Sequence, residues 1–160
     1  MRLADVRPVA DLAPHEEYIE PDITDLEAFT AACEGIDTVL HLAADPSPQA
    51  DFYQSLLSLN IIGGYNGFEA ARRAGSQRIV FASSINAVLG YRGAEAVSWD
   101  VPVFPQNVYG ATKCFGEALG RVYADQHGMA CISPRDTAQL FARCSAAIAV
   151  TASPTFHTIK

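Results

Sequence analysis

Apolar residues in this chain occur in two patterns, short continuous runs and longer stretches with helical spacing. The short runs predict buried β-strands at residues 1–5, 18–20, 38–42, 78–82 and 129–132. The longer stretches repeat apolar residues every three or four positions and predict helices at residues 24–33, 52–74 and 108–126. This alternation is typical of an α/β fold with a doubly wound parallel sheet. Beyond Pro134 the chain is rich in Ala, Ser and Thr and has no clear strand signal.

Local signals refine two of the predicted helices. Thr24 and Glu27 match a capping box, in which a hydroxyl and a carboxylate bond the first free amides of a helix. Gly63, Gly64 and Gly67 lie inside the second helix. A glycine there weakens a helix by up to about 1 kcal/mol, so we expect these three to permit close packing.

The composition indicates a globular protein of one domain. Of the 160 residues, 49% are hydrophobic, the net charge is −7 and no run of Lys or Arg is present, so nucleic acid is not an expected partner. No signal peptide or membrane span is visible, because the apolar stretch at residues 138–150 is short and contains Arg143. The four cysteines are Cys33, Cys114, Cys131 and Cys144. They lack the spacing of a metal site, so we expect reduced thiols, no metal and a cytoplasmic protein.

Tyr109 and Lys113 carry the strongest chemical signal. They lie four positions apart, so one face of a helix holds both side chains. A phenol has a pKa of about 10, too high for a base at neutral pH, and a neighbouring ammonium lowers it. A hydroxyl from Ser83 or Ser84 could then hold a substrate oxygen. The spacing arises by chance in about 8% of chains with this composition, so a surface Tyr–Lys pair on an amphipathic helix remains an alternative.

Other polar and small residues are predicted at the same edge of the sheet. Asp5, Asp22, Ala43 and Ser84 each follow a predicted strand. Ligands of open α/β sheets bind at the carboxyl ends of the strands. This convergence favours a functional site over a chance motif.

Four segments together resemble a known family. They are His41-Leu-Ala-Ala44, Asn60-Ile-Ile-Gly63, Arg78-Ile-Val-Phe-Ala-Ser-Ser84 and Tyr109-Gly-Ala-Thr-Lys113. In order and spacing they resemble the extended short-chain dehydrogenases/reductases, the NAD-dependent epimerase/dehydratase family, and most of all its uronate dehydrogenases. The resemblance covers roughly residues 1–132 and implies a Rossmann-like fold.

The resemblance implies roles for individual residues. Tyr109 would be the general acid/base, Lys113 would lower its pKa, and Ser84 would bond the reacting oxygen. Ser84 and Asn86 would contact the substrate. The residues that would contact NAD are Asp5, Asp22, Ile23, Leu42, Ala43, Ala44, Asn60, Ala82, Tyr109 and Lys113. An acidic Asp5 would favour NAD over a phosphorylated cofactor.

Several of these residues also have a structural interpretation. Asp5 could belong to a turn, and Asp22 could be a solvated strand end. Asn60 and Asn66 could bridge helix backbone to a neighbouring strand. His41 is interpreted as a core histidine rather than a catalyst.

The chain departs from the family at both ends. It contains no Gly-x-x-Gly-x-x-Gly turn, and residues 135–160 do not resemble the family's substrate-binding lobe. We therefore expect a partial NAD-binding domain at residues 1–134, without the first strand, and an atypical tail at residues 135–160. Loss of a central strand would either close the sheet up or leave open edges, with residues 1–5 poorly anchored.

The predicted function is that of an NAD-dependent oxidoreductase acting on a sugar or a uronic acid. The motifs also serve a sugar-nucleotide epimerase or dehydratase. A third interpretation is a truncated, non-catalytic remnant. The resemblance further implies a homodimer formed through the two long helices, at residues 52–74 and 108–126.

Overall fold

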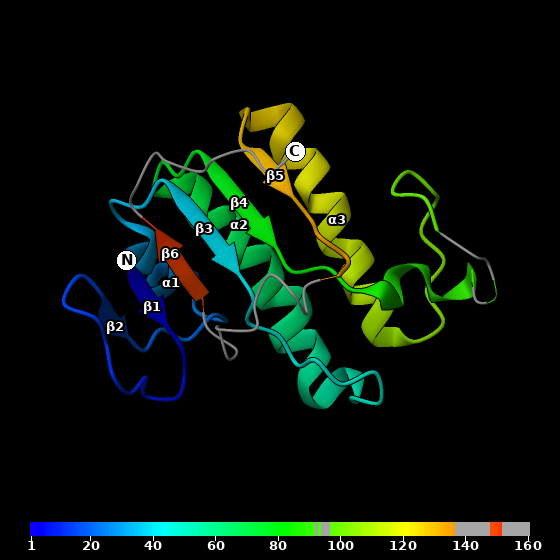
Figure 1. Cartoon of the computed structure of the whole chain (residues 1–160), viewed down its shortest axis with the longest axis horizontal. Helices are drawn as coiled ribbons and strands as arrows, with labels where there is room; N and C mark the ends of the chain where they lie inside the picture. The colour runs from blue at the N-terminus through cyan, green and yellow to red at the C-terminus, as the bar shows by residue number, and fades with distance from the viewer. Residues whose placement is uncertain (92, 94–96, 137–147, 152–160) are drawn as a thin grey trace.

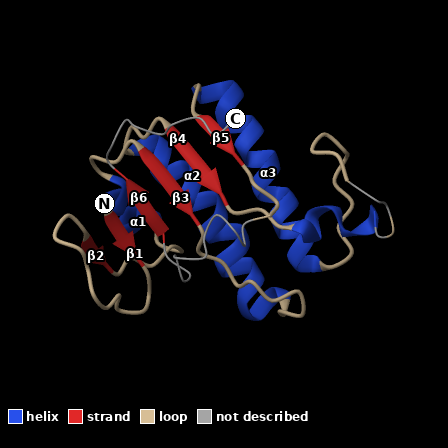
Figure 2. Cartoon of the chain, in the orientation of Figure 1, coloured by secondary structure: helices blue, strands red, loops and turns tan. Residues whose placement is uncertain are grey.

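The computed structural model describes residues 1–91, 93, 97–136 and 148–151, and shows one sheet with its α-helices packed on one face (Figures 1 and 2). The strands are β1 (Arg2–Ala4), β2 (Glu17–Ile19), β3 (Thr38–His41), β4 (Arg78–Phe81), β5 (Ala130–Ile132) and β6 (Ile148–Thr151). The helices are α1 (Leu26–Cys33), the π-helix η1 (Phe52–Ile62), α2 (Gly63–Arg73), the 3-10 helix η2 (Ile85–Tyr91) and α3 (Val108–His127). The predicted Rossmann-like α/β architecture is confirmed.

The sheet has the order β2-β1-β6-β3-β4-β5, and β6 lies between β1 and β3. Pairing is parallel between β1 and β2 and among β3, β4 and β5, whereas β6 runs antiparallel to both of its neighbours. Figure 1 shows β6 in red-orange within the continuous sheet.

The prediction that residues 1–5 are poorly anchored is wrong. Leu3 pairs with Tyr18 on one side and with Ala149 on the other. The sheet has neither closed up nor kept open edges at its centre, because a strand from the tail fills that place. Antiparallel pairing satisfies the backbone N–H and C=O groups of β1 and β3 as well as a parallel strand would. Residues 137–147 and 152–160 of the predicted tail lie outside the described residues.

The N-terminus of α1 also differs from the prediction. Asp25, rather than Thr24, caps the helix, and its carboxylate accepts hydrogen bonds from the amides of Glu27 and Ala28. The Thr24 hydroxyl instead donates to Asp22 at 2.7 Å. The side-chain oxygen of an aspartate caps a helix N-terminus as well as a threonine hydroxyl does.

Glycines in the second predicted helix permit close packing at two of three positions. A Cβ atom at Gly63 would lie 2.6 Å from Cδ1 of Ile23, and one at Gly67 would lie 2.5 Å from Cδ2 of His41. Gly64 has no such neighbour within 4 Å, so close packing does not explain it. The predicted continuous helix is divided into η1 and α2.

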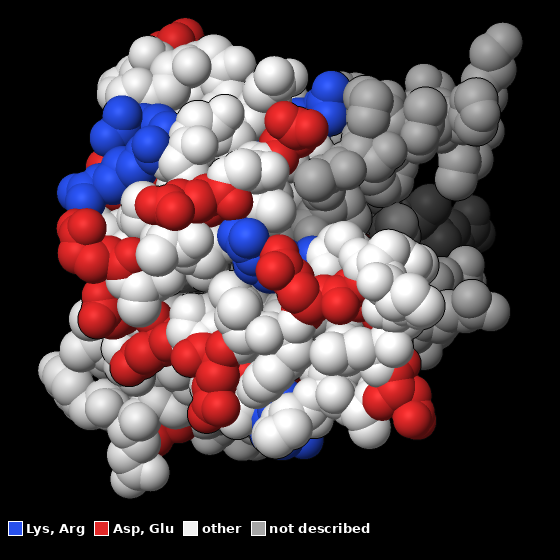
Figure 3. Space-filling view, turned by 90° about the vertical axis from the view of Figure 1, so that its left-hand side faces the viewer, with Lys and Arg blue, Asp and Glu red and all other residues white. Residues whose placement is uncertain are grey.

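Disulfides, membrane-spanning helices and metal-ligand clusters are absent from the described residues. Cys33, Cys114 and Cys131 are free thiols, as expected, and burial raises the pKa of Cys33 to about 12; Cys144 lies outside the described residues. No helix within the described ranges is long and apolar enough to cross a membrane, and no cluster of metal-ligating side chains occurs there. Acidic side chains are spread over the face formed around β1, β2 and α1 (Figure 3).

His41 lies in the core, as the sequence indicated. It is 1% exposed, and its ring stands against Phe29 and Phe81 with centroid distances of 5.5 and 5.8 Å. Nε2 lies 3.1 Å from the carbonyl oxygen of Gly63, whereas Nδ1 has no hydrogen-bond partner. Burial, together with the nearby Lys113 ammonium, lowers the pKa of His41 to about 4.

Acid should therefore destabilise the fold through His41. The folded-state pKa is lowered, so stability is complete above the unfolded value of 6.5 and is lost as the pH falls towards 4. The loss from this group amounts to about 3 kcal/mol of unfolding free energy. His41→Gln keeps a donor for Gly63 and removes the titration, so urea denaturation should show a weaker pH dependence between pH 4 and 6.5. His15→Gln, at an exposed histidine, should retain the wild-type pH dependence; equal profiles for both variants would contradict the assignment.

Candidate functional site

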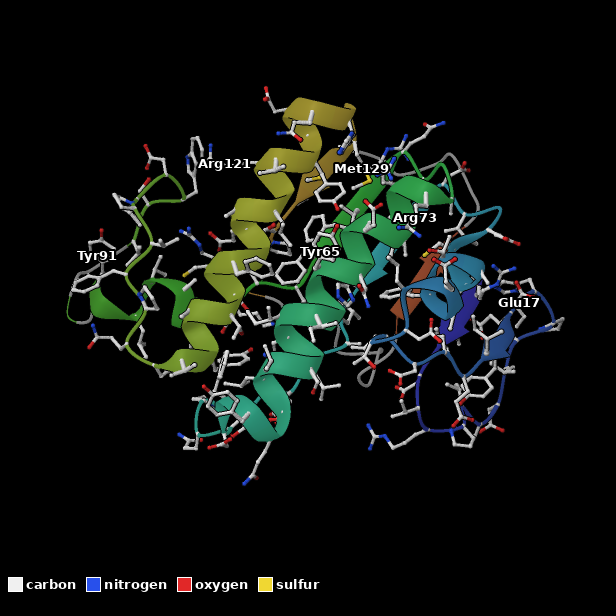
Figure 4. The ribbon with its side chains drawn as sticks, turned by 180° about the vertical axis from the view of Figure 1, so that it is seen from behind. Glu17, Tyr65, Arg73, Tyr91, Arg121 and Met129 are labelled. Carbon is white, nitrogen blue, oxygen red and sulfur yellow. The ribbon has the colours of Figure 1, made fainter. Side chains whose placement is uncertain are left out.

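The predicted site residues converge on the carboxyl end of β4 and the N-terminal half of α3, which lie side by side (Figures 1 and 4). Ala82, Ser83 and Ser84 directly follow β4, and Tyr109 and Lys113 face them from the first turns of α3. The parallel strands β1 and β3 end at the same edge of the sheet.

Local sequence fixes where α3 begins. The Asn107 side chain caps the helix by accepting a hydrogen bond from the amide of Gly110 at 2.7 Å. A Cβ atom at Gly110 would lie 2.4 Å from the carbonyl oxygen of Asn86, so only glycine lets η2 approach this closely. The first turn of α3 is thereby held beside the segment that carries Ser84.

Lys113 is buried and bonded to β4. Its Nζ donates to the carbonyl oxygen of Ala82 at 2.9 Å and lies 5.6 Å from the ring centroid of Tyr109. Burial lowers its pKa to about 8, so the ammonium remains the dominant form at pH 7. The ammonium therefore makes its hydrogen bond with a carbonyl oxygen, and its positive charge lies 5.6 Å from the centre of the Tyr109 ring.

The predicted depression of the Tyr109 pKa is not found in this structure. Burial raises the pKa of Tyr109, the hydrogen bond with Ser84 lowers it, and the negative charge of Asp45 raises it further. The net shift of the pKa is upward because burial of Tyr109, which is only 7% exposed, outweighs the effect of Ser84. The phenol is therefore protonated at neutral pH in this form of the protein.

The two serines have different partners. The Ser83 hydroxyl donates to Oε1 of Glu117 at 2.6 Å. The Ser84 hydroxyl accepts from the backbone and side-chain nitrogens of Asn86, both at 3.2 Å, and it lies near enough to Tyr109 to lower the pKa of the phenol. Of the two alternatives that the sequence left open, this geometry favours Ser84 as the partner of Tyr109.

Asn86 connects Ser84 to the start of α3. Its Nδ2 donates to Ser84, and its Oδ1 accepts from Nδ2 of Asn107 at 2.8 Å. Both ends of this amide are thus engaged within the protein. Its arrangement supports a role in orienting Ser84, in addition to the substrate contact that the sequence suggested.

The two predicted acidic residues take part in turns. Oδ1 of Asp5 accepts from the amide of Arg7 at 2.9 Å. Oδ1 of Asp22 accepts from the amide and hydroxyl of Thr24, and these bonds lower the pKa of Asp22. Ile23 is buried against Gly63. Both carboxylates nevertheless stand after parallel strands, at the edge that carries Ser84.

The remaining predicted residues follow β3 or lie on η1. Leu42, Ala43 and Ala44 are partly buried after the end of β3. Asn60 is a structural bridge: Oδ1 accepts from the amide of Asp45, and Nδ2 donates to the Asp45 carbonyl and to the hydroxyl of Thr112. Its three bonds join the loop after β3 to η1 and α3, as its structural interpretation anticipated.

Sequence reasoning missed three residues around the serines. Asn107 follows a proline-containing loop and precedes a periodic helix, a signal that marks an N-cap. Glu117 lies one further turn beyond Lys113 on the same face of α3. Arg135, which donates from Nε and NH2 to Glu117 at 2.9 and 2.8 Å, had no recognisable pattern around it.

A cavity of about 710 Å³ flanks this region on the side of β5. Its lining includes Ile85, Trp99, Glu117, Arg121 and Arg135. Tyr109 and Ser84 are not part of the lining. The cavity therefore reaches Glu117 but not Tyr109 or Ser84.

Comparison with known proteins gives one consistent result. Residues 2–138 match the NAD dependent epimerase/dehydratase family. The chain is 37% identical over 136 residues to a uronate dehydrogenase of Pseudomonas putida, covering 84% of this chain and 50% of that protein. It is 42% identical over 126 residues to the L-arabinose 1-dehydrogenase (NAD(P)(+)) of Haloferax volcanii, covering 71% and 49%.

A solved structure shares the fold. A mutant uronate dehydrogenase from Agrobacterium tumefaciens, complexed with NAD, superposes with a TM-score of 0.71 at 40% identity, covering 81% of this chain and 48% of that one. The chain thus spans about half the length of the relatives it matches.

Replacing Asn60 should destabilise the protein more than replacing Asn66. Both side chains are buried, but Asn66 makes one hydrogen bond, to the Ile23 carbonyl, whereas Asn60 makes three. At about 1 kcal/mol per net hydrogen bond, we expect Asn60→Ala to lower the unfolding free energy by about 2–3 kcal/mol and Asn66→Ala by about 1 kcal/mol. Chemical denaturation measures both. Equal losses would contradict the bridging role of Asn60.

Proposed function

The chain belongs to the NAD dependent epimerase/dehydratase family, and we propose that it is an NAD-dependent oxidoreductase that acts on a sugar or a uronic acid. The observation that carries this proposal is the placement of Tyr109 and Lys113 on one face of α3 beside the end of β4, where the buried Lys113 donates to the Ala82 carbonyl at 2.9 Å. Its relatives among the uronate and arabinose dehydrogenases support the substrate class.

The described residues fit NAD in part. A buried lysine and a tyrosine stand beside the end of β4, small residues follow β3, and Asp5 follows β1. A dinucleotide's pyrophosphate ordinarily sits on a glycine-rich turn at a helix N-terminus after the central strand. In the described part of the chain β6 holds that central place, and the sequence contains no Gly-x-x-Gly-x-x-Gly turn. Residues of the type that would contact the two riboses are therefore present, whereas the family's pyrophosphate-binding turn is not.

Ser84 and Tyr109 would have separate roles in proton transfer. The Ser84 hydroxyl would hold the reacting oxygen, and the Tyr109 phenol would exchange a proton with it. NAD, when bound, supplies the hydride acceptor and a positively charged ring. Further positive charge near the phenol, added to that of Lys113, would offset the burial that now raises the Tyr109 pKa.

Two other functions use the same residues. An epimerase or dehydratase would return the hydride to the sugar, and the Tyr109–Ser84 contact serves that chemistry equally. A non-catalytic remnant is favoured by one observation, the occupation of the sheet centre by β6. We also propose that the protein works in the reducing cytoplasm, in agreement with its free thiols.

Tyr109→Phe should separate binding from chemistry. Loss of the phenol hydroxyl removes the proton-transfer group, so turnover of galacturonate or glucuronate with NAD should fall about 100-fold or more. NAD affinity, measured by calorimetry, should stay within about twofold of wild type. Reduction of NAD is followed at its near-ultraviolet absorbance.

Assays of NAD binding and NAD reduction by the wild-type protein distinguish the three candidate functions. Net NAD reduction with a uronic acid supports the dehydrogenase. NAD binding with sugar interconversion but no net reduction would indicate the epimerase or dehydratase. Absence of NAD binding would leave the non-catalytic remnant.

We further propose a homodimer formed by the faces of α2 and α3 that point away from the sheet. Figure 4 shows Tyr65 on this side, between the two helices. Ile62, Tyr65 and Val122 are each 43% exposed. A second copy would cover these apolar side chains.

Tyr65→Arg should weaken that dimer. A guanidinium at the centre of an apolar interface is costly to desolvate, so sedimentation velocity should shift from dimer to monomer. Val6→Arg, at an exposed residue near β1, is the control and should not change the sedimentation coefficient. A wild-type protein that is monomeric at all concentrations would refute the dimer.

A further inference from the structure

A carboxylate network lies beside the two serines that follow β4. Glu117 of α3 accepts three hydrogen bonds, one from Ser83 at 2.6 Å and two from Arg135 at 2.9 and 2.8 Å. The side chains of Glu117 and Arg135 are only 16% and 22% exposed. A backbone hydrogen bond also joins the segment after β4 to the segment after β5, because the Ser83 amide donates to the Pro134 carbonyl at 3.0 Å.

We propose that Glu117, held by Arg135, is a positioning residue that fixes Ser83 and thereby directs the hydroxyl of Ser84 at Tyr109. The role in catalysis rests on the proposed function, whereas the positioning itself is a property of the folded chain.

The argument begins with one stripe of α3. Tyr109, Lys113 and Glu117 are spaced by four residues and therefore share one helix face. Each contacts a different member of the three-residue segment after β4. Lys113 donates to the carbonyl of Ala82, and Glu117 accepts from the hydroxyl of Ser83. Tyr109 lies near the hydroxyl of Ser84, which lowers the pKa of the phenol.

The segment needs such anchors because it has left the sheet. β4 ends at Phe81, and Ala82 makes the last backbone bond to β3, from its amide to the His41 carbonyl at 3.0 Å. Ser83 and Ser84 share a peptide group, and their hydroxyls have different partners, Glu117 for Ser83 and Asn86 for Ser84. Fixing the Ser83 hydroxyl limits rotation of the shared peptide and so orients Ser84.

Arg135 makes Glu117 suitable for this task. Burial raises the pKa of the Glu117 carboxyl, but hydrogen bonds from Arg135 and Ser83 outweigh it and keep the pKa below its ordinary value. The carboxylate is therefore ionised at neutral pH and acts purely as an acceptor. The two-pronged contact with Arg135 also fixes its plane, which leaves Oε1 directed at Ser83.

The test measures the environment of Tyr109 directly, without requiring turnover. Protein labelled with ¹³C at tyrosine Cζ reports the hydrogen bonding of each phenol at neutral pH, and Tyr109→Phe assigns the Tyr109 signal. We expect Ser83→Ala and Glu117→Ala to shift the Tyr109 signal, together with the amide signals of Ser84 and Asn86. Glu117→Gln retains an acceptor for Ser83, so it should largely restore the wild-type signal.

A matched control separates positioning from stability. Ser76, at the other end of β4, is similarly buried at 7%, and its hydroxyl donates to the Ile36 carbonyl at 2.6 Å. Ser76→Ala removes the same kind of bond and should lower the melting temperature while leaving the Tyr109 signal unchanged. If Glu117→Ala does not fold, Ser83→Ala and Glu117→Gln still decide the matter.

Kinetics give the second readout where the wild type turns over. Ser83→Ala should lower kcat roughly tenfold with little change in KM, because misplacement of a catalytic group affects the chemical step. A Tyr109 signal that is unchanged in Ser83→Ala and Glu117→Ala would overturn the positioning role, even if turnover is intact. A shifted signal in a protein that neither binds NAD nor turns over would sustain the positioning and reject the proposed function instead.

Discussion

The short separation between α3 and the end of β4 is the constraint on which the candidate site depends. Besides Gly110, which admits the backbone of Asn86, Gly116 admits the ring of Phe81: a Cβ atom there would lie 2.2 Å from Cε1. No side chain at these positions separates helix from strand. Polar groups of α3 can therefore reach the backbone and hydroxyls of the segment after β4, and the site is assembled by packing rather than by any long-range charge.

Close packing of α3 against the end of β4 also removes water from the charged groups of Lys113 and Glu117, which costs desolvation free energy. Among the described residues, Lys113 has a single hydrogen-bond acceptor, the carbonyl oxygen of Ala82, and burial lowers its pKa to about 8. Glu117 is better compensated, since Arg135 and Ser83 both donate to it. A buried charge is tolerated where hydrogen bonds replace the lost water. The two residues show how differently that condition can be met within one turn of the same helix.

Sequence patterns were sufficient for the parts of the molecule that local chemistry determines. The strands ending near His41 and Phe81, and the helix beginning at residue 108, follow from apolar spacing alone. The hydrogen-bond partners of the site residues could not be predicted in the same way, because they come from distant segments of the chain. Ser83 lies 34 residues from Glu117, and Asn60 lies 52 residues from Thr112. The direction of the Tyr109 pKa likewise follows from burial, which no spacing of residues reveals. The tail strand β6 was missed because Ala-rich sequence carries no alternation to recognise.

The antiparallel direction of β6 has a consequence for how this kind of sheet is encoded. β1 and β3 are parallel to each other and stand two strand spacings apart, yet the strand between them runs the other way. Their edges thus specify that a strand must lie there, but not its polarity or its place along the chain. The direction of the central strand depends on how the chain enters the sheet, whereas the helices packed on one face hold β1 and β3 at their distance. The central position of this sheet is therefore compatible with a strand of either direction.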